Sequence, residues 1–435
     1  MSAQTDEPAE SGVDVAPPGA AAEGGAPRKA HANVLRVDKL RLRGFRNLAS
    51  TDLEPGPAFN VIHGDNGAGK SNLLEALHYL GALRSFRGAR TEDMLSQQGD
   101  EAILRARVSG EAAPRAFSIQ LQRGKARTLV LDGKRPRSIS RWHQAIQVVL
   151  FHPGDLRMAI GGPEARRTLL DRILEQMDPT YTSTLATYTK ALRSRNRLLK
   201  KEDVDRRSIT AFDQILAEAG AVVGQTRARL ADELAPSAER AFEEVIGESV
   251  PLEIRYQHRV PPDPEQILRA LHAAYEKDRA RGFTADGPHG DDLVMRVQEV
   301  VAKHHASQGQ HRAIVLALKV AELDVLTRSV GRVPLLLLDD VSSELDRSRN
   351  RRLFELLRDP GLAANMSTTP ICQLDRFSYD FMREFPRAGG VARGPYSALT
   401  GRGVCVRYGR DRNFARHDQE TAAIRCAQHS CGALL

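Results

Sequence analysis

The sequence is poor in the residues on which several protein classes depend. Four of its 435 residues are cysteine and only 5% are aromatic, with a single tryptophan. All four cysteines stand at or after Cys372, and their spacing contains no paired C-x-x-C zinc motif. A disulfide framework is not expected either, because we expect the protein to be cytoplasmic. The sequence also has no pattern typical of a catalytic serine triad or of a module that reads DNA bases.

Long apolar runs are missing as well. No segment approaches the ~20 unbroken apolar residues of a membrane-spanning helix, so no membrane partner is expected. Residues 1–33 are rich in alanine, glycine, proline and acids and have no apolar central block. This composition predicts a disordered leader and not a secretory signal. The net charge of +8 suits an anionic partner such as nucleic acid, although many soluble proteins are equally basic.

A phosphate-binding loop is the clearest motif that is present. Apolar residues 59–62 predict a strand and 71–83 predict a helix, so the motif lies at a strand-to-helix turn, as a phosphate loop must. Its glycines let backbone N–H groups curl around phosphate oxygens, and the helix adds the positive end of its dipole. Lys70 is expected to reach the β- and γ-phosphates of ATP, and Ser71 to help hold Mg²⁺. The motif consists of Gly64, Asp65, Asn66, Gly67, Ala68, Gly69, Lys70 and Ser71.

Two acids end a second apolar run. Residues 333–338 are typical of a strand buried on both faces of a parallel sheet. Asp339, at the carboxyl end of this strand, is expected beside the phosphate loop, where it would hold Mg²⁺ through water. Asp340 is expected to orient or deprotonate the attacking water, so Asp340 and Lys70 are the candidate catalytic residues. A strand that ends in a solvated turn can also end in aspartate by chance.

A third polar string opens a long predicted helix. Apolar residues recur at helical spacing over 310–326, and the residues before them are small and polar. Such a helix start can receive a γ-phosphate, and because the phosphate loop already occupies one side of the nucleotide, it is expected to serve a second subunit. An ordinary serine N-cap is the alternative. The candidate ATP-binding residues here are Ser307, Gly309 and Gln310.

Taken in order, these motifs resemble those of the RecF family of bacterial DNA recombination and repair ATPases, relatives of the SMC proteins in the ABC class. The resemblance runs from about residue 34 to about residue 357. It implies a signature helix at 306–312 that acts in trans across an ATP-clamped dimer, Walker B acids at Asp339 and Asp340, and a D-loop at 343–346. Shorter strings also match in order: Gly44-Phe45-Arg46-Asn47, Ser85-Phe86-Arg87, Phe151-His152-Pro153-Gly154-Asp155-Leu156 and Gly287-Pro288-His289-Gly290-Asp291-Asp292.

The resemblance implies an α/β fold: an ABC-type P-loop ATPase head with an inserted α-helical arm lobe. The expected divisions are the leader at 1–33, the first part of the head at 34–160, the helical arm at 161–250, the second part of the head at 251–357, and a divergent tail of uncertain order at 358–435. In the tail, the family pattern of a helix, a buried strand and a polar loop is hard to find. A divergent end, a frame-shifted reading and a disordered extension all stay open.

Periodicity predicts the elements within these divisions. Alternating apolar residues over 34–42 predict a strand followed by a turn at Gly44. Three further alternating stretches predict an antiparallel meander, with a hairpin turn at Asp132-Gly133. Helical spacing over 169–192 and again over 212–234 predicts two antiparallel helices. The meander stretches are 102–108, 116–122 and 127–131.

By resemblance, the protein is expected to dimerise on ATP, to bind single-stranded or gapped DNA without sequence preference, and to work with a RecR-like loading protein in recombinase loading and the SOS response. Its hydrolysis is expected to be slow and stimulated by DNA. Two alternatives stay open: a nucleotide-binding motor subunit of a membrane transporter, and a DNA clamp that holds ATP without turnover. The transporter would need a membrane partner and would normally lack the helical insert.

Two basic clusters are candidate DNA contacts. Phosphate contacts need only positive charge at suitable spacing and carry no sequence information. The same residues are equally typical of a solvated, charged face. The clusters are Arg84, Arg87 and Arg90, and, near the end of the arm, Arg193, Arg195, Arg197, Lys200 and Lys201.

Overall fold

The computed structural model describes residues 33–56, 60–63, 66–110, 113–202, 206–340, 349, 351–352, 371–373, 398–399 and 404–408. Gly64, Asp65, the predicted D-loop and almost all of the predicted leader lie outside the described residues. In the part that is described, no helix is long and apolar enough to cross a membrane.

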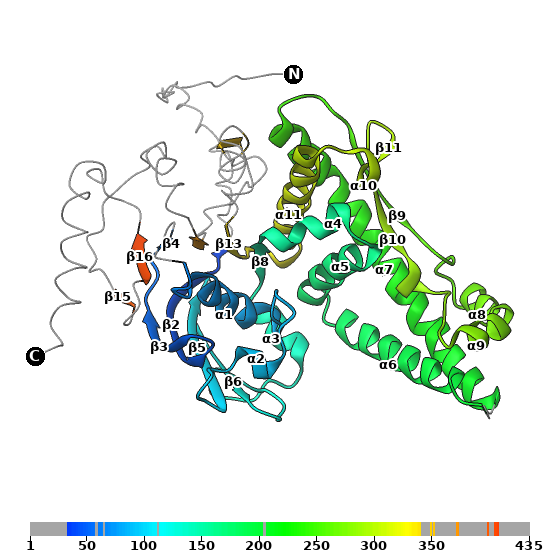
Figure 1. Ribbon diagram of the computed structural model, residues 1–435, viewed down its shortest axis with the longest axis horizontal. Helices are drawn as coiled ribbons and strands as arrows, with labels where there is room; N and C mark the ends of the chain where they lie inside the picture. The colour runs from blue at the N-terminus through cyan, green and yellow to red at the C-terminus, as the bar shows by residue number, and fades with distance from the viewer. Residues whose placement is uncertain are drawn as a thin grey trace, which may run out of the picture. The chain divides into compact units, whose positions relative to one another are not determined.

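The central sheet is mainly parallel and has the strand order β15-β16-β4-β14-β13-β8 (Figure 1). Its parallel strands β8 (Val148–Phe151), β13 (Leu335–Leu338), β14 (Ile371–Gln373) and β4 (Asn60–His63) pair in register, with Leu338 opposite Phe151. All four residues of β13 are buried, as predicted for a strand covered on both faces. Pro334 separates β13 from the short β12 (Arg332–Val333), which pairs instead with β1 (Asn33–Val34).

Part of the tail enters this sheet. β14 lies between β13 and β4, so residues 371–373 supply a strand at the centre of the sheet. β16 (Val404–Tyr408) pairs antiparallel with β4, and β15 (Ala398–Leu399) pairs with β16. The sequence left the order of the tail open, and the structure places these three segments in the sheet that carries the Walker B strand.

A five-stranded antiparallel sheet covers one side of the first helix. Its order is β3-β2-β5-β6-β7, with β2 at Arg36–Phe45, β3 at Leu48–Leu53, β5 at Glu101–Ser109, β6 at Arg115–Gln122 and β7 at Thr128–Leu131. The predicted meander is therefore present, and Asp132 and Gly133, with φ of 51° and 78°, form the predicted tight turn between Leu131 and Lys134. The turn predicted at Gly44 is wrong. Gly44 lies within β2, where a Cβ would come 2.4 Å from the Glu101 carbonyl oxygen, and the chain turns at Arg46 and Asn47.

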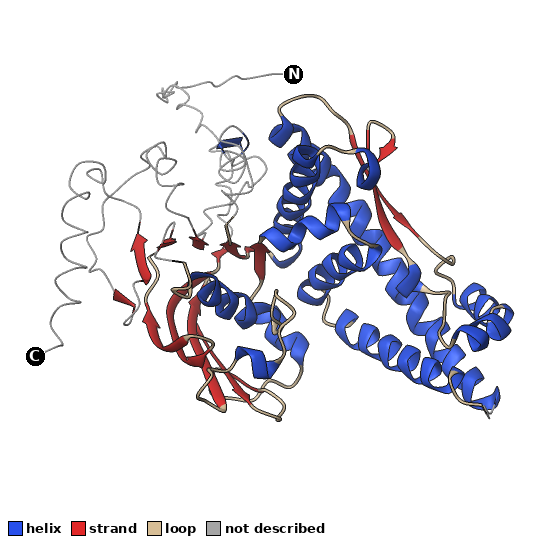
Figure 2. Ribbon diagram, in the orientation of Figure 1, coloured by secondary structure: helices blue, strands red, loops and turns tan. Residues whose placement is uncertain are grey.

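Helix α1 (Lys70–Ala82) packs between this sheet and one face of the central sheet (Figure 2). Val148, Leu150, Leu335 and Leu337 face α1, whereas Val149, Phe151, Leu336 and Leu338 belong to the core built by the later helices. This alternation is the period of two expected of a strand. It makes β8 and β13 the shared wall of two hydrophobic cores.

The second core is helical. Helices α5 (Pro163–Met177), α6 (Tyr181–Leu199), α7 (Arg206–Ile246) and α11 (Gln308–Val330) contribute most of it. The single helix predicted over 169–192 is wrong, because it is interrupted at Asp178. Asp178 has an extended backbone and precedes Pro179, which disfavours helical geometry in the residue before it. The predicted second helix is α7, whose 41 residues span ~60 Å at the usual rise.

Shorter elements complete the chain around these helices. The small sheet β11-β10-β9, with β9 at Leu252–Gln257, β10 at Asp292–Val297 and β11 at Val300–Val301, packs on α7. Helices α8 (Pro264–Ala273) and α9 (Tyr275–Arg281) lie near the α6–α7 connection (Figure 1). The remaining helices are α2 (Thr91–Met94), α3 (Ile139–Ala145), η1 (Pro153–Leu156), α4 (Arg157–Ile160), η2 (Pro288–Gly290) and α10 (Ala302–His305).

Candidate nucleotide site

The described end of the phosphate loop leads directly into α1. Gly67 and Gly69 have φ of 80° and 106°, the left-handed region that favours glycine. A Cβ at Gly69 would lie 2.8 Å from Leu48 and 2.9 Å from the Asn47 side chain, so both backbone shape and space require glycine there. Lys70 is the first residue of the helix and is buried. The loop is thus held at the positive end of the α1 dipole, where an anion is stabilised.

Two asparagines brace this loop. The Asn47 side chain donates a hydrogen bond to the Gly67 carbonyl at 3.0 Å. Asn72 in turn donates to Asn47 at 2.8 Å, and Arg87 donates to Asn72 at 2.8 Å. The β2–β3 turn and the segment after α1 therefore fix the loop before any nucleotide binds, which lowers the cost of ordering it.

Glu75 joins the same segments beneath the loop. It is fully buried, although it lies on the apolar helix α1. Arg46 donates to its two carboxylate oxygens at 2.5 and 2.8 Å, and the Ser85 hydroxyl donates at 2.5 Å. Arg46 and Ser85 are 29 and 10 positions from Glu75 in the sequence. Only the folded structure shows that both contact its carboxylate. Sequence reasoning missed Glu75, and a lone acid among the apolar residues of α1 was the available signal.

Asp339 lies beside the phosphate loop, as predicted. Its backbone N–H donates to the Phe151 carbonyl at 2.8 Å, which fixes it at the end of β13. Ser71 forms a hydrogen bond with the Asp339 carboxylate. Burial raises the pKa of Asp339, while the positive charge of Arg87 and the Ser71 hydrogen bond pull that pKa down. The segments that carry Ser71 and Asp339 therefore meet in one site.

The surroundings of Asp339 fit a magnesium ion. Its Oδ1 atom is buried and accepts no hydrogen bond from the described residues. A buried carboxylate oxygen of this kind needs a cation or an ordered water. Mg²⁺ keeps most of its waters and takes few protein ligands, so one carboxylate and the Ser71 hydroxyl suffice. Elsewhere, the described residues contain no group of three or more acidic, histidine or cysteine side chains placed to hold a metal.

Asp340 follows directly, with its backbone in the left-handed region at φ 52°. Aspartate tolerates this region better than most residues, and strain there is typical of functional sites. Its negative charge contributes to the raised pKa of Asp339, so the two carboxylates are close. Asp340 thus lies directly after β13, with its carboxylate close to that of Asp339.

The signature string forms the start of α11. Ser307 is the N-cap: its hydroxyl accepts a hydrogen bond from the Gln310 N–H at 3.2 Å, and the Gln310 side chain accepts from the Ser307 N–H at 2.8 Å. The ordinary cap that the sequence offered as an alternative is therefore present. Ser307 is also exposed, and in the described part of the chain it and Gln310 bond to each other and not to the phosphate loop. A Cβ at Gly309 would lie 2.3 Å from Arg349.

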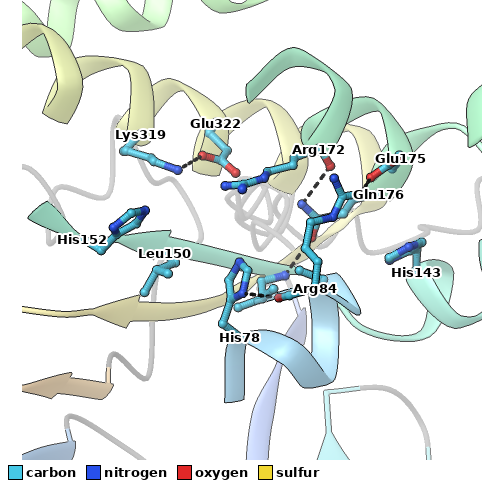
Figure 3. Close-up of a pocket in the computed structure, with 12 residues that line it drawn as sticks. His78, Arg84, His143, Leu150, His152, Arg172, Glu175, Gln176, Lys319 and Glu322 are labelled. Carbon is cyan, nitrogen blue, oxygen red and sulfur yellow. Dashed lines mark hydrogen bonds and ion pairs between the residues drawn. The ribbon is translucent and has the colours of Figure 1, made fainter. Parts of the chain in front are cut away.

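A buried polar seam, formed by His152, Asp155, Lys319 and Glu322, lies between the end of β8 and α11. Figure 3 shows His152, Lys319 and Glu322 of this seam. The His152 Nδ1 atom accepts from the Gly154 N–H at 3.1 Å, and its Nε2 atom lies 3.1 Å from the Asp155 carboxylate. The Lys319 ammonium of α11 lies 3.9 Å from Asp155 and 2.9 Å from Glu322. Burial opposes the charge on Asp155, but Lys319 and His152 outweigh it and hold the pKa of Asp155 below its usual value.

The seam encloses a small cavity between α1, β8, α5 and α11. Its free volume is about 20 Å³, room for one or two water molecules and not for a nucleotide. Burial lowers the pKa of His78 well below its usual value and that of His143 to about 4, so both imidazoles are neutral near pH 7. The lining residues include His78, Arg84, His143, Leu150, His152, Arg172, Glu175, Gln176, Lys319 and Glu322.

The structure buries one of the predicted DNA contacts, pairs two others within the protein and leaves the rest exposed. Arg195 is fully buried, with Asp213 at 2.6 Å and Asp278 at 2.7 Å, so the prediction that it touches DNA is wrong. It joins α6, α7 and α9, and a buried arginine with two acid partners is a structural residue. Arg84 pairs with Glu175, and Arg87 belongs to the loop network described above. The other residues of the two clusters are exposed: Arg90, Arg193, Arg197, Lys200 and Lys201.

Comparisons with known proteins agree with this geometry. Residues 36–366 match the RecF/RecN/SMC N terminal domain family. The chain is 37% identical over 345 residues to the DNA replication and repair protein RecF of Anaeromyxobacter sp. (strain Fw109-5), which covers 77% of this chain and 92% of that protein. It is 34% identical over 348 residues to the same-named protein of Citrifermentans bemidjiense, covering 78% of this chain and 95% of that one.

Solved structures show the same likeness. A structure of the recombination mediator protein RecF with ATP, in the RecFOR pathway, superposes with a TM-score of 0.73 at 28% identity. It covers 80% of this chain and 94% of that chain. A second structure, RecF-ATPrS of the same pathway, gives a TM-score of 0.71, also at 28% identity, and covers 79% and 93% of the two chains.

Proposed function

Because the chain belongs to the RecF family of DNA replication and repair proteins, we propose that it is an ATP-dependent DNA-binding protein of recombinational repair. In this proposal ATP binding drives two copies together around two nucleotides, the dimer holds gapped or single-stranded DNA, and hydrolysis releases it. A RecR-like loading protein is the proposed partner, and the outcome is recombinase loading and SOS induction in the cytoplasm. The observation that carries the proposal is the meeting of Gly69, Lys70, Ser71 and Asp339 in one site.

Each of these residues has a distinct task in the proposal. The N–H groups at the start of α1 cradle the phosphates, and the Lys70 ammonium pairs with the β- and γ-phosphates. Ser71 and Asp339 would hold Mg²⁺, which neutralises phosphate charge when it is bound. Asp340 orients the attacking water and accepts its proton. Its position directly after β13, with a left-handed backbone and beside the Asp339 carboxylate, supports this role.

The signature helix acts on the other subunit in this proposal. Ser307 is exposed at the N-terminus of a 23-residue helix, where the dipole and unused N–H groups favour an anion. The ordinary cap at Ser307 leaves this task open, because the cap uses the Gln310 N–H and α11 has other unpaired N–H groups in its first turn. The γ-phosphate of a second copy supplies the anion.

Two alternatives were a transporter subunit and a DNA clamp without turnover. The first loses its support, and a turnover assay tests the second. Membership of this family and the helical insert α5–α7 argue against a transporter subunit. A clamp without turnover differs from the proposed ATPase only in its rate, and Asp340 favours a slow rate. Many ABC ATPases carry glutamate at this point, and aspartate is one methylene shorter, so it orients water less well.

Sedimentation velocity of the purified full chain tests the proposal. The protein is compared without nucleotide, with ADP and with ATP, each with Mg²⁺. We expect a monomer in the first two states and a dimer with ATP. A monomer in all three states, at high protein concentration and with enough ATP to saturate the binding site, would overturn the proposed dimer. Adding gapped DNA then shows whether the dimer retains it.

A further inference from the structure

The antiparallel sheet has a basic outer face that the sequence analysis did not single out. Its inner face packs on α1, and the alternating residues on the other side point to solvent. Arg41 and Arg43 of β2 and Arg105 and Arg107 of β5 are all exposed, and Lys39 is half-buried. We call these five residues, Lys39, Arg41, Arg43, Arg105 and Arg107, the β2–β5 basic face. They outnumber the acids on the same side, which among the described residues are Asp52, Glu54, Glu101 and Asp38, the last of which accepts a hydrogen bond from the Ser109 hydroxyl at 2.8 Å.

Like charges stand directly opposite each other on this face. Arg41 is the cross-strand partner of Arg105, and Lys39 is the partner of Arg107. Directly opposed like charges destabilise a sheet, typically by a few tenths of a kcal/mol or more per pair. A sequence selected only for stability would place an acid or a neutral residue at one position of each pair. The arrangement therefore points to an anionic ligand that lies over the face.

The acids present do not cancel the charge of β5. Asp52 is shared between Arg41 at 3.2 Å and Arg43 at 3.1 Å. Lys39 pairs with Glu54 at 2.5 Å. Arg105 and Arg107 have no ion pair within the described residues, and their partners on β6 are Ser118 and Ala116. Two guanidinium groups are thus left for an outside anion.

The shape and chemistry of the face select the ligand. Alternate residues of a strand repeat every ~6.8 Å and neighbouring strands lie ~4.8 Å apart, so the cations form a grid and not a pocket. The face carries none of the exposed large apolar side chains of the described chain, so it lacks the apolar centre of a protein interface. It also lacks an exposed aromatic ring on which an unpaired base would stack.

We propose that the β2–β5 basic face binds the phosphate backbone of duplex DNA, the double-stranded flank of the gapped substrate. The proposal rests on the proposed function, since it assigns the DNA of that function to a surface. Arg105 and Arg107 contact phosphates through their forked donors, and Arg41, Arg43 and Lys39 add to the field. Contacts of this kind fix position and carry no base preference.

The test measures duplex affinity, with ATP, as a function of salt. In Arg105→Gln with Arg107→Gln, both charges disappear while each side chain remains polar and able to form hydrogen bonds. The matched control is Arg229→Gln with Arg240→Gln, two exposed arginines on α7 whose loss changes net charge equally. Circular dichroism and ATP affinity verify that both variants fold.

We expect the β5 variant to flatten the plot of log affinity against log salt by about 1.8, or about 0.9 for each lost contact. At 0.1 M salt this corresponds to a loss of about 60-fold in duplex affinity. The control keeps the parent slope. If the parent binds neither duplex DNA nor oligo-dT with ATP, the proposed function is wrong. If it binds oligo-dT but not duplex DNA, the proposed function stands and duplex DNA is not the ligand of this face. If the parent binds and the β5 variant binds as tightly, or both variants lose affinity equally, the assignment to this face is wrong.

Single-stranded oligo-dT provides the remaining comparison. The absence of an exposed aromatic predicts that the β5 variant loses duplex affinity by a larger factor than oligo-dT affinity. A loss confined to oligo-dT would overturn duplex DNA as the ligand of this face.

Discussion

The Lys319 ammonium lies 3.9 Å from the Asp155 carboxylate, and this contact links the signature helix α11 to the turn that follows β8. The same turn follows Phe151 directly, and the Phe151 carbonyl accepts a hydrogen bond from the Asp339 N–H at 2.8 Å. A short stretch of chain, residues 151–155, therefore contacts both the Walker B acid and the helix that begins at Ser307. Within one protomer, the site for its own nucleotide is physically connected to the helix that we propose serves its partner's nucleotide.

Replacement of Lys319 by methionine tests how much this contact contributes to the stability of the protein. Lys319→Met keeps the length of the apolar stem of the side chain, but it leaves the buried carboxylates of Asp155 and Glu322 without their shared cation. Breaking a buried charge cluster in this way costs about 3 to 5 kcal/mol. Urea unfolding at pH 7 measures the loss.

The matched control is Arg328→Met on the same helix. Arg328 pairs with Asp324 at 3.2 Å, but its side chain is 59% exposed, so its loss costs at most about 1 kcal/mol. Equal effects of the two substitutions on the free energy of unfolding would show that the Lys319 cluster contributes no more than a surface pair.

Acid should destabilise the protein through His143. Burial lowers the pKa of this imidazole to about 4 from the usual 6.5, so between these values the unfolded chain binds a proton that the folded chain does not. Stability is then fully present above pH 6.5 and is lost as the pH falls toward 4, by about 2 kcal/mol between pH 7 and pH 5. His143→Gln still allows a hydrogen bond to the Gly81 carbonyl and should remove this part of the pH dependence.

Urea unfolding at pH 7 and pH 5 checks this expectation. His272→Gln is the control, because the His272 side chain is 50% exposed. We expect the control to keep the parent's loss of stability between the two pH values. A His143→Gln protein that loses as much stability as the parent would show that His143 is not the group responsible.

Replacement of each Walker B acid by asparagine should affect ATP affinity and turnover differently. Asp340→Asn removes the carboxylate that takes up a proton, so it should bind ATP and dimerise while turnover falls by about 10²- to 10⁴-fold, the usual contribution of general base catalysis. Asp339→Asn weakens the magnesium site as well, so its ATP affinity should fall together with its turnover. Calorimetry and a turnover assay at one salt concentration give both quantities. Parent-like turnover in Asp340→Asn would assign the catalytic base to another residue.

The nucleotide site could be predicted because its parts are local. The glycines around Lys70 must suit a tight turn, and the apolar run before Asp339 must be a buried strand. Each signal lies within about ten residues. The inserted helices were recognisable for the same reason, and only Pro179, whose effect on Asp178 outweighed the helical spacing, broke the prediction.

Long-range partners could not be predicted. Glu75 is stabilised by Arg46, 29 positions away, and Arg195 by Asp278, 83 positions away. Charge on its own does not reveal whether an arginine is buried with acids or exposed, so Arg195 was misassigned to DNA. The basic face did leave a trace, since Arg105 and Arg107 alternate with apolar residues at the period of a strand. Their position opposite Lys39 and Arg41 becomes visible only in the folded sheet.

The central claim is that each nucleotide is shared between two copies, with the phosphate loop of one and Ser307 of the other. Two single variants separate these halves. Lys70→Ala should weaken ATP binding by about 2 to 5 kcal/mol. Ser307→Arg should leave ATP binding by the monomer intact and should block the dimer through bulk and positive charge at the helix N-terminus.

Mixing these two variants in equal amounts is the most direct measurement. A mixed dimer has one complete site, built from the phosphate loop of the Ser307→Arg chain and the Ser307 of the Lys70→Ala chain. The account predicts ATP-dependent dimers by sedimentation, and ATP turnover, in the mixture but in neither variant alone. A mixture that behaves as the sum of two inactive proteins, while each variant remains folded, would contradict a site shared between two copies.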